Sequence, residues 1–329
     1  MRESICAALT CACLLTNMPF NPKQASAVPF PKAVAPDPVP LFQQVERSTI
    51  TIALQASKQT PDPADIYVPS TPATPKKFPI VLLLQGALVD KSAYSTFATE
   101  VARYGFIVVV PNHTRSLTAP NGQTISGLAS EQQQVNDVLK QMIAENANPK
   151  SRLANRVDIT RLGLLGHSFG GYVGLGAIQN RCFPGVCTGS FTRPPALKAG
   201  IFYGTNFRTP PITGTFPMIA NQNIPTALIA GSLDGVSTLD ETQKTYRQIQ
   251  TLPKALIVVK GANHYGITNE DNPRDPSRPT LTQTQSNTTI ARWSAWFLRA
   301  HLLNDPVAFD RVYKQGNTYD SNVSVTSAK

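Results

Sequence analysis

The chain has 329 residues, of which 41% are hydrophobic, so it can bury one large core. Its net charge is +10, but the basic residues are scattered, and the longest run is the pair Lys76-Lys77. This pattern predicts a positively charged surface without the basic cluster that nucleic-acid-binding proteins carry. We therefore expect no nucleic-acid partner.

The N-terminus has the features of an export signal. Arg2 precedes an apolar stretch over residues 5–15, which is too short to cross a bilayer, and the small residues at 25–27 offer a cleavage site. We expect a signal peptide over 1–27 and an exported protein that is periplasmic or secreted. No later stretch has the length and apolar character of a transmembrane helix, so we expect no integral membrane segment after signal removal.

Strand and helix patterns alternate over 47–314, after a proline-rich segment at 28–46 that we expect to be a linker. Short apolar runs predict strands, and apolar residues at helical spacing predict helices between them. The expected strands lie at 47–54, 64–68, 80–84, 106–110, 162–165, 198–203, 226–230 and 255–259, and the expected helices at 92–104, 130–147, 172–179, 239–250 and 290–303. The alternation predicts an α/β domain with a mostly parallel twisted sheet and helices on both faces. The polar segment 315–329 is expected to be a flexible tail.

Two of the five cysteines, Cys182 and Cys187, lie beyond the expected signal peptide and flank a tight Phe-Pro-Gly-Val turn. In an oxidising compartment they can close a small disulfide loop, and the alternative is a pair of reduced thiols. Neither has the histidine or acidic neighbours of a metal site, and the four histidines show no ligand spacing. We predict no metal ion and no nucleotide, because phosphate-binding glycine motifs are also missing from the sequence.

The pattern Gly166-His167-Ser168-Phe169-Gly170 is the sharpest chemical signal in the sequence. A serine hydroxyl becomes a useful nucleophile when a rigid turn presents it and a base removes its proton. The pattern follows the buried strand at 162–165 and opens a helix, which is the context that a nucleophile elbow requires. Ser168 is the predicted nucleophile.

The general base is expected at the carboxyl end of a strand, where reactive groups gather in open α/β sheets. His264 lies in the loop directly after the strand at 255–259. His167 belongs to the elbow and is expected to point away from the serine, His113 precedes the nucleophile, and His301 lies deep in the final helix. His264 is therefore the predicted base.

The orienting acid is found by elimination. The chain order in this type of sheet is serine, acid, histidine, and only Asp234, Asp240 and Glu241 lie between Ser168 and His264. Asp240 and Glu241 open a helix, where carboxylates favourably meet the helix dipole. Asp234 follows the strand at 226–230, so it is the predicted acid.

The transition state of acyl transfer carries an oxyanion that needs two preorganised N–H donors. We expect one from Phe169, just after the nucleophile, and the other from Ala87, with Leu88 as the alternative. Leu88, Val236 and Tyr265 flank the expected site and are mostly apolar. They are candidate contacts for an acyl or aromatic group of the substrate, although such residues can equally belong to the core.

Together these residues resemble the α/β-hydrolase superfamily, and within it esterases of the dienelactone-hydrolase-like, chlorophyllase-like, platelet-activating-factor-acetylhydrolase-like and bacterial cutinase-like types. The likeness covers about 80–303. It rests on Gly166–Gly171, Ala230–Asp234, Gly261–His264 and the segment IVLLLQGALVDKSAYSTFATEVARYGFIVVVPNH.

The resemblance implies that the chain cleaves a small-molecule or lipid-like ester through an acyl-enzyme, without a metal or organic cofactor. It places nucleophile, acid and base on Ser168, Asp234 and His264. Many relatives have His-Gly in the oxyanion loop where this chain has Gln85-Gly86, and dienelactone hydrolases proper use a cysteine nucleophile. Two alternatives stay open: an acyltransferase with the same triad, and a binding protein without catalysis on this scaffold.

Overall fold

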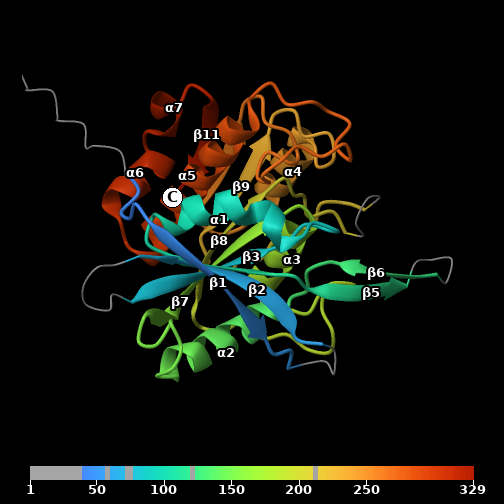
Figure 1. The fold of residues 1–329 in the computed structure, drawn as a ribbon. Helices are drawn as coiled ribbons and strands as arrows, with labels where there is room; N and C mark the ends of the chain where they lie inside the picture. Colours follow the sequence, from blue (N-terminus) through green and yellow to red (C-terminus); the bar gives the residue numbers. More distant parts are fainter. Residues whose placement is uncertain (1–38, 56–59, 71–76, 119–122, 210–213) are drawn as a thin grey trace, which may run out of the picture. The chain divides into compact units, whose positions relative to one another are not determined.

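The computed structural model describes residues 39–55, 60–70, 77–118, 123–209 and 214–329, so the expected signal peptide over 1–27 lies outside the described residues. Within these ranges one sheet has the order β1-β2-β4-β3-β7-β8-β9-β10-β11 (Figure 1). Its strands are β1 (Val45–Ile52), β2 (Asp62–Pro69), β3 (Phe78–Leu84), β4 (Ile107–Pro111), β7 (Val157–His167), β8 (Leu197–Tyr203), β9 (Thr226–Gly231), β10 (Lys254–Val259) and β11 (Val323–Ala328).

The centre of the sheet is parallel and its margins are antiparallel. The six strands from β4 to β10 pair in parallel, whereas β1–β2, β2–β4 and β10–β11 are antiparallel. Parallel strands are covered on both faces, which explains why β3 is apolar and buried along its whole length. The predicted α/β class with a mostly parallel sheet is confirmed.

Two layers of helices cover the sheet. Side chains alternate along β3, so that Val81 and Leu83 enter the core on one face while Leu82 and Leu84 enter the core on the other. The first face packs against α1 (Ser95–Ala102), α5 (Gln283–Leu302) and α6 (Pro306–Tyr313). The second packs against α2 (Gln134–Ala147), α3 (Phe169–Ile178) and α4 (Leu239–Gln248) (Figure 1). No helix in the described ranges has the length and apolarity needed to cross a bilayer.

The prediction of a flexible tail over 315–329 is wrong. The segment contains the short helix α7 (Gly316–Tyr319) and strand β11, which pairs with β10 over six residues. Two valines at alternating positions, Val323 and Val325, pack against the core, and β11 covers a strand edge that β10 would otherwise expose. The α/β domain therefore extends beyond the predicted limit of 314.

Other element boundaries also differ from the prediction. Strand β1 begins at Val45, inside the segment predicted to be a linker over 28–46. Helix α5 begins at Gln283 instead of 290, because Thr282 and Gln285 form a capping box that starts the helix earlier. A hairpin of β5 (Thr114–Thr118) and β6 (Thr124–Leu128) projects from the body and has no counterpart in the prediction (Figure 1).

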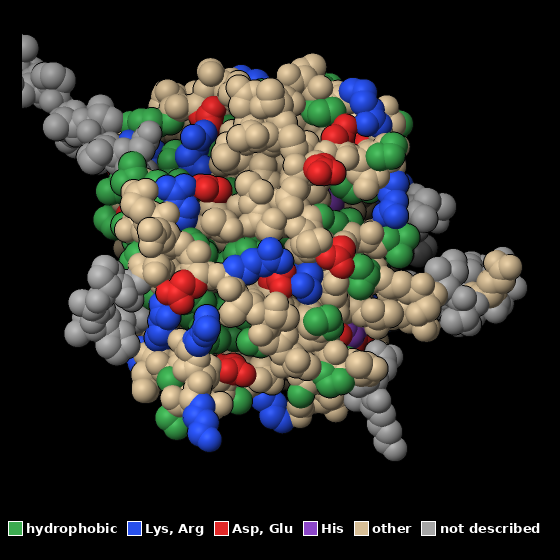
Figure 2. Space-filling model, viewed as in Figure 1, with side chains coloured by type: hydrophobic (Ala, Val, Ile, Leu, Met, Phe, Trp, Pro, Cys, Tyr) green, Lys and Arg blue, Asp and Glu red, His purple; other side chains and the backbone are tan. Residues whose placement is uncertain are grey.

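Charged side chains on the molecular surface are mixed in sign. On the face shown in Figure 2, Lys and Arg side chains alternate with Asp and Glu, and no single-sign field covers that face. Several exposed cations of the described residues form ion pairs, such as Lys244 with Asp240 at 2.6 Å. Such exposed pairs contribute little to stability.

Candidate active site

The elbow around Ser168 has the strained geometry that its glycines predict. Ser168 joins β7 to α3 with φ 52° and ψ −119°, a conformation that L-residues rarely adopt. A Cβ on Gly166 would lie 2.7 Å from the Gly170 carbonyl oxygen, and a Cβ on Gly170 would collide with the Leu84 carbonyl. Only glycine at both positions allows the helix to approach the strand this closely.

Three side chains distant in sequence form one hydrogen-bonded chain. Nε2 of His264 lies 2.8 Å from Oγ of Ser168, and Nδ1 lies 3.0 and 2.9 Å from the two carboxylate oxygens of Asp234. A carboxylate at Nδ1 holds the proton on that nitrogen, so Nε2 is left as an acceptor for the serine proton. His264 and Asp234 are both buried, and Ser168 is half-buried.

The sheet brings these groups together. Ser168, Asp234 and His264 follow β7, β9 and β10, which run in the same direction with β8 between the first two. Their carboxyl ends meet at one edge, where reactive groups gather in α/β sheets. Asp234 is fixed further because its Oδ1 accepts the N–H groups of Val236 at 2.9 Å and Ser237 at 2.7 Å.

The loop after β3 presents one N–H group that has no acceptor among the described residues. Gly86 donates to Oη of Tyr94 at 2.9 Å, and Leu88 donates to the Leu128 carbonyl at 2.7 Å. Ala87 lies between them, and its N–H has no acceptor among the described residues. The same holds for Phe169 at the start of α3, as for the first N–H groups of any helix. This arrangement favours Ala87 over the alternative donor Leu88.

The side chain of Gln85, in the loop after β3, has a defined structural role. Its Nε2 donates to the His113 carbonyl at 3.2 Å, and its Oε1 accepts the His113 N–H at 3.1 Å. Ser130 donates to the Gln85 carbonyl at 3.0 Å. The residue thereby ties the loop after β3 to the base of the β5–β6 hairpin.

His167 points away from Ser168, as predicted from its place in the elbow. Its Nδ1 lies 2.9 Å from the Tyr94 hydroxyl, and its Nε2 lies 3.0 Å from the His264 carbonyl. A carbonyl only accepts, so Nε2 carries the proton and Nδ1 accepts from Tyr94. Burial and the neighbouring His264 hold the pKa of His167 well below its ordinary value of 6.5, so it is neutral. The sequence did not reveal this connection.

Asp275 is a second carboxylate at the site that the sequence analysis missed. It is fully buried, and its Oδ2 accepts the backbone N–H of His264 at 2.7 Å. Asp275 follows both the serine and the histidine, so it lies outside the interval in which the chain order predicts the acid. Its one sequence signal is the cluster of turn residues over 271–277, which looks like an ordinary loop.

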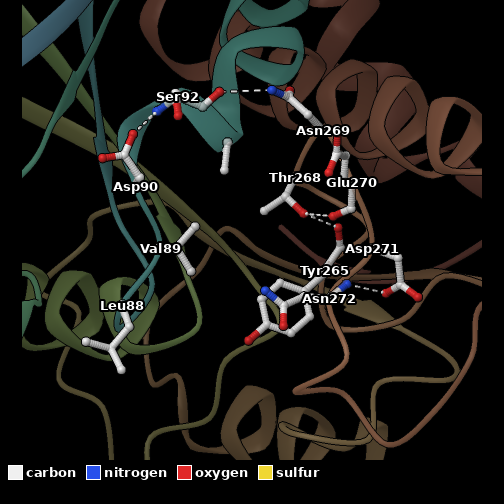
Figure 3. Close-up of a pocket in the computed structure, with 11 residues that line it drawn as sticks. Leu88, Val89, Asp90, Ser92, Tyr265, Thr268, Asn269, Glu270, Asp271 and Asn272 are labelled. Atoms are coloured by element: carbon white, nitrogen blue, oxygen red, sulfur yellow. Dashed lines mark hydrogen bonds between the residues drawn. The ribbon is translucent and has the colours of Figure 1, made fainter.

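Two hollows lie beside the loops that carry the triad residues, and Ser168 lines one of them. One has a volume of about 280 Å³ and includes Ser168, Phe169, Tyr172, Asn206, Arg208 and Val236 in its lining. The other has a volume of about 350 Å³ and lies between residues 88–93 and 265–272, with Leu88 and Tyr265 in its lining (Figure 3). The three predicted substrate contacts are thus divided, with Val236 beside the nucleophile and the other two in the second hollow.

The structure also joins Cys182 and Cys187 in a disulfide, with their Cα atoms 5.3 Å apart. This loop packs against Gln133 of the segment leading into α2, whose amide donates to the Thr188 carbonyl at 2.6 Å. In the part of the chain that the structure describes, no three His, Cys, Asp or Glu side chains are arranged to hold a metal ion.

Comparison with known proteins gives matches of two kinds. A family model described as Chlorophyllase matches residues 39–180, which include Ser168 and the loop after β3. Chlorophyllase-1, chloroplastic, of Citrus unshiu is 30% identical over 150 residues, or 45% of this chain and 44% of its own length. The chain therefore spans less than half the length of this chlorophyllase.

Cutinases match over a longer part of the chain but with a lower sequence identity. Cutinase 2 of Thermobifida cellulosilytica is 25% identical over 232 residues, which are 68% of this chain and 69% of the cutinase. A cutinase of Thermobifida fusca (strain YX) is 25% identical over 232 residues, covering 68% of this chain and 56% of the relative.

Proposed function

We propose that the chain is an α/β-hydrolase that cleaves carboxylic esters through an acyl-enzyme on Ser168, because parts of it resemble chlorophyllases and cutinases. The observation that carries the proposal is the hydrogen-bonded chain from Asp234 through His264 to Ser168, with 2.8 Å between Nε2 and Oγ. This distance lies within the range in which a base takes the proton of a serine hydroxyl.

The reaction uses each of these groups in turn. Nε2 of His264 takes the proton as Oγ of Ser168 attacks the ester carbonyl, and the N–H groups of Ala87 and Phe169 stabilise the oxyanion. Each such donor stabilises the transition state by about 3 kcal/mol. The imidazolium then gives its proton to the leaving alcohol, and His264 activates a water that releases the acid.

The hollow beside the nucleophile supports an ester with an apolar or aromatic group. The rings of Phe169 and Tyr172 stack with their centroids 6.3 Å apart, and the Val236 side chain beside them is 46% exposed. A series of p-nitrophenyl esters with acyl chains of graded length tests this. We expect Val236→Asp to lower kcat/KM for the apolar esters; an unchanged profile would remove Val236 from the acyl site.

A fluorophosphonate probe tests the assignment of the nucleophile. Such probes phosphorylate an activated serine, so we expect labelling of the wild-type protein and none of Ser168→Ala. Ser190→Ala, on an exposed loop, is the matched control and keeps full labelling. Equal labelling of the wild type and Ser168→Ala would refute the proposal. Product analysis with a competing alcohol separates hydrolysis from acyl transfer.

We further propose that the protein is exported and loses residues 1–27. The disulfide between Cys182 and Cys187 supports this, because disulfides persist mainly in oxidising compartments. N-terminal sequencing of the protein recovered from periplasm or medium is expected to begin at Val28. Recovery of the full-length chain from the cytoplasm alone would contradict export.

A further inference from the structure

Asp275 is buried without a cation. Its side chain is fully inaccessible to solvent, and no Lys or Arg of the described residues forms an ion pair with it. Arg278 reaches only its backbone carbonyl. Taking a carboxylate out of water is costly unless hydrogen bonds replace the lost hydration. The fold must therefore supply donors of another kind.

Three backbone N–H groups are these donors, and they come from separate parts of the site. Oδ2 accepts from His264 at 2.7 Å, and Oδ1 accepts from Gly235 at 3.2 Å and from Ser277 at 2.8 Å. The bond to Ser277 is local and belongs to an ordinary turn around an aspartate. The other two bonds reach 11 and 40 residues back along the chain.

These two long-range donors belong to the triad loops. Gly235 is the neighbour of Asp234 in the loop after β9, and the N–H of His264 belongs to the loop after β10. One carboxylate thus spans the loop of the acid and the loop of the base. A Cβ on Gly235 would lie 2.6 Å from Oδ1 of Asp275, which shows how closely the acid loop approaches the carboxylate.

The segment carrying Asp275 is itself held against the base loop. The Asn263 amide donates to Asp271 at 2.7 Å and to the Ser277 carbonyl at 3.1 Å. Arg278 pairs with Asp271 at 2.8 Å. Arg274, which directly precedes Asp275, donates to the Leu88 carbonyl of the oxyanion loop at 3.4 Å. The segment therefore contacts all three loops that frame Ser168.

We propose that Asp275 is a positioning residue that holds the acid and base loops at a fixed separation, so that the imidazole of His264 stays aligned between Asp234 and Ser168. The proposal rests on the proposed hydrolase function. A displacement of the base by a few tenths of an ångström weakens both proton transfers, because they depend steeply on distance and angle. Asp275 contacts no substrate; it acts through the two loops.

The variant Asp275→Asn tests the positioning role of Asp275, because the substitution hardly changes the side-chain volume. An amide has one acceptor oxygen, so its NH2 group faces either the His264 N–H or the N–H groups of Gly235 and Ser277. We expect kcat per active site, counted by fluorophosphonate titration, to fall by about 10- to 100-fold, with KM changed less than about threefold. The loss is larger for alkyl esters than for p-nitrophenyl esters, because a poor leaving group needs proton donation from His264.

Two further variants distinguish positioning from general loss of stability. Asp320→Asn removes the charge of another buried carboxylate, which pairs with Arg292 and Trp293 outside the site, and is expected to leave kcat per active site unchanged. Gly235→Ala keeps the Asp275 carboxylate but pushes the acid loop away from it. It is expected to show the same dependence on the leaving group, even where Asp275→Asn does not fold.

A proton NMR spectrum gives a readout that needs no substrate. The Nδ1 proton between His264 and Asp234 resonates far downfield, and we expect its signal to shift or broaden in both Asp275→Asn and Gly235→Ala but not in Asp320→Asn. An unchanged signal together with an unchanged kcat in folded Asp275→Asn or Gly235→Ala would overturn the proposal. A wild-type protein that neither reacts with the fluorophosphonate probe nor cleaves esters would overturn the hydrolase function. In that case the NMR comparison alone still tests whether Asp275 positions the imidazole of His264.

Discussion

The hydroxyl of Tyr94 donates to Nδ1 of the buried His167 across 2.9 Å. The same oxygen accepts the N–H of Gly86 at 2.9 Å, and His167 passes the connection on to the His264 carbonyl at 3.0 Å. A continuous hydrogen-bonded chain thus links the oxyanion loop to the base loop beneath the nucleophile. The direction of every bond in this chain is fixed, because the carbonyl at one end can only accept and the N–H at the other can only donate.

Tyr94→Phe is expected to disturb both loops. The change leaves the Gly86 N–H and His167 Nδ1 buried without partners, which costs about 1–3 kcal/mol in the free energy of unfolding. We also expect a lower kcat, since the loop that presents the Ala87 N–H loses its anchor. Urea denaturation and ester hydrolysis measure the two effects.

Tyr67→Phe is the matched control for Tyr94→Phe. The Tyr67 hydroxyl is also buried, but it has no hydrogen-bond partner among the described residues. Removing it costs no hydrogen bond, so we expect unchanged or slightly higher stability and unchanged kcat. Equal effects of the two substitutions would contradict the role given to Tyr94.

Asp234→Asn is expected to lower kcat by about 10³- to 10⁴-fold with a small effect on KM. The asparagine amide favours the imidazole tautomer with a proton on Nε2, which can no longer accept the proton of Ser168. Asp240→Asn is the matched control, because Asp240 lies exposed at the start of α4 and pairs with Lys244. Steady-state kinetics with one ester compare the two variants; a comparable loss in both would remove Asp234 from its proposed role.

The sequence contained enough information for the triad geometry because each member is marked by a local pattern. Ser168 lies in a glycine-rich turn, and Asp234 and His264 each follow a short apolar run that predicts a buried strand. Parallel pairing of β7, β8, β9 and β10 then forces the three strand ends to one edge. Local pattern and sheet topology together suffice for this part of the site.

The contacts of Asp275 and Tyr94 could not be predicted in this way. Asp275 lies in a polar loop whose composition suits any exposed turn, and its partner Gly235 is 40 residues away. Tyr94 lies on the short helical turn η1 (Lys91–Tyr94), where an aromatic residue is expected in the core. Only the packed structure shows that a buried polar atom on each reaches a loop of the site.

Strand β11 could not be predicted from the sequence for a related reason. The segment is short and polar, and its two valines give a weak alternation that many frayed termini share. Its place is decided by the exposed edge of β10, which offers six residues for antiparallel pairing. Such an edge strand depends on tertiary contacts more than on its own propensity.

Truncation after Gln315 is therefore expected to destabilise the domain. It removes the pairing of β10 with β11, the buried Val323, and the contacts of Asp320 with Arg292 and Trp293. Loss of buried apolar area alone costs about 2–3 kcal/mol, which lowers the melting temperature by several degrees and leaves an edge that promotes aggregation. Thermal unfolding measures this effect, with the exposed substitution Ser324→Ala in the full chain as the control. Equal melting temperatures of the two proteins would support the prediction of a flexible tail instead.

His113 is expected to make stability fall at alkaline pH. Burial alone would lower its pKa, but the hydrogen bond with Asp62 and the negative charges of Asp62 and Glu131 raise it from 6.5 to about 9. Between these values the folded protein keeps a proton that the unfolded chain has lost. The stabilisation is complete below about pH 6.5 and is lost as pH rises to about 9, by up to roughly 3 kcal/mol. Urea denaturation between pH 6 and 10 measures this decline.

His301 provides the matched comparison, because burial lowers its pKa from 6.5 to about 4. As pH falls from about 6.5 towards 4, the unfolded chain binds a proton that the buried His301 does not bind. His301 therefore lowers the stability of the folded state only in this acidic range. His113→Asn keeps a donor towards Asp62 but cannot be charged, so we expect the decline between pH 6.5 and 9 to disappear in this variant. His301→Gln keeps that alkaline decline and instead reduces the loss of stability on the acidic side. An alkaline decline of the same size in His113→Asn and in the wild type would show that another group causes it.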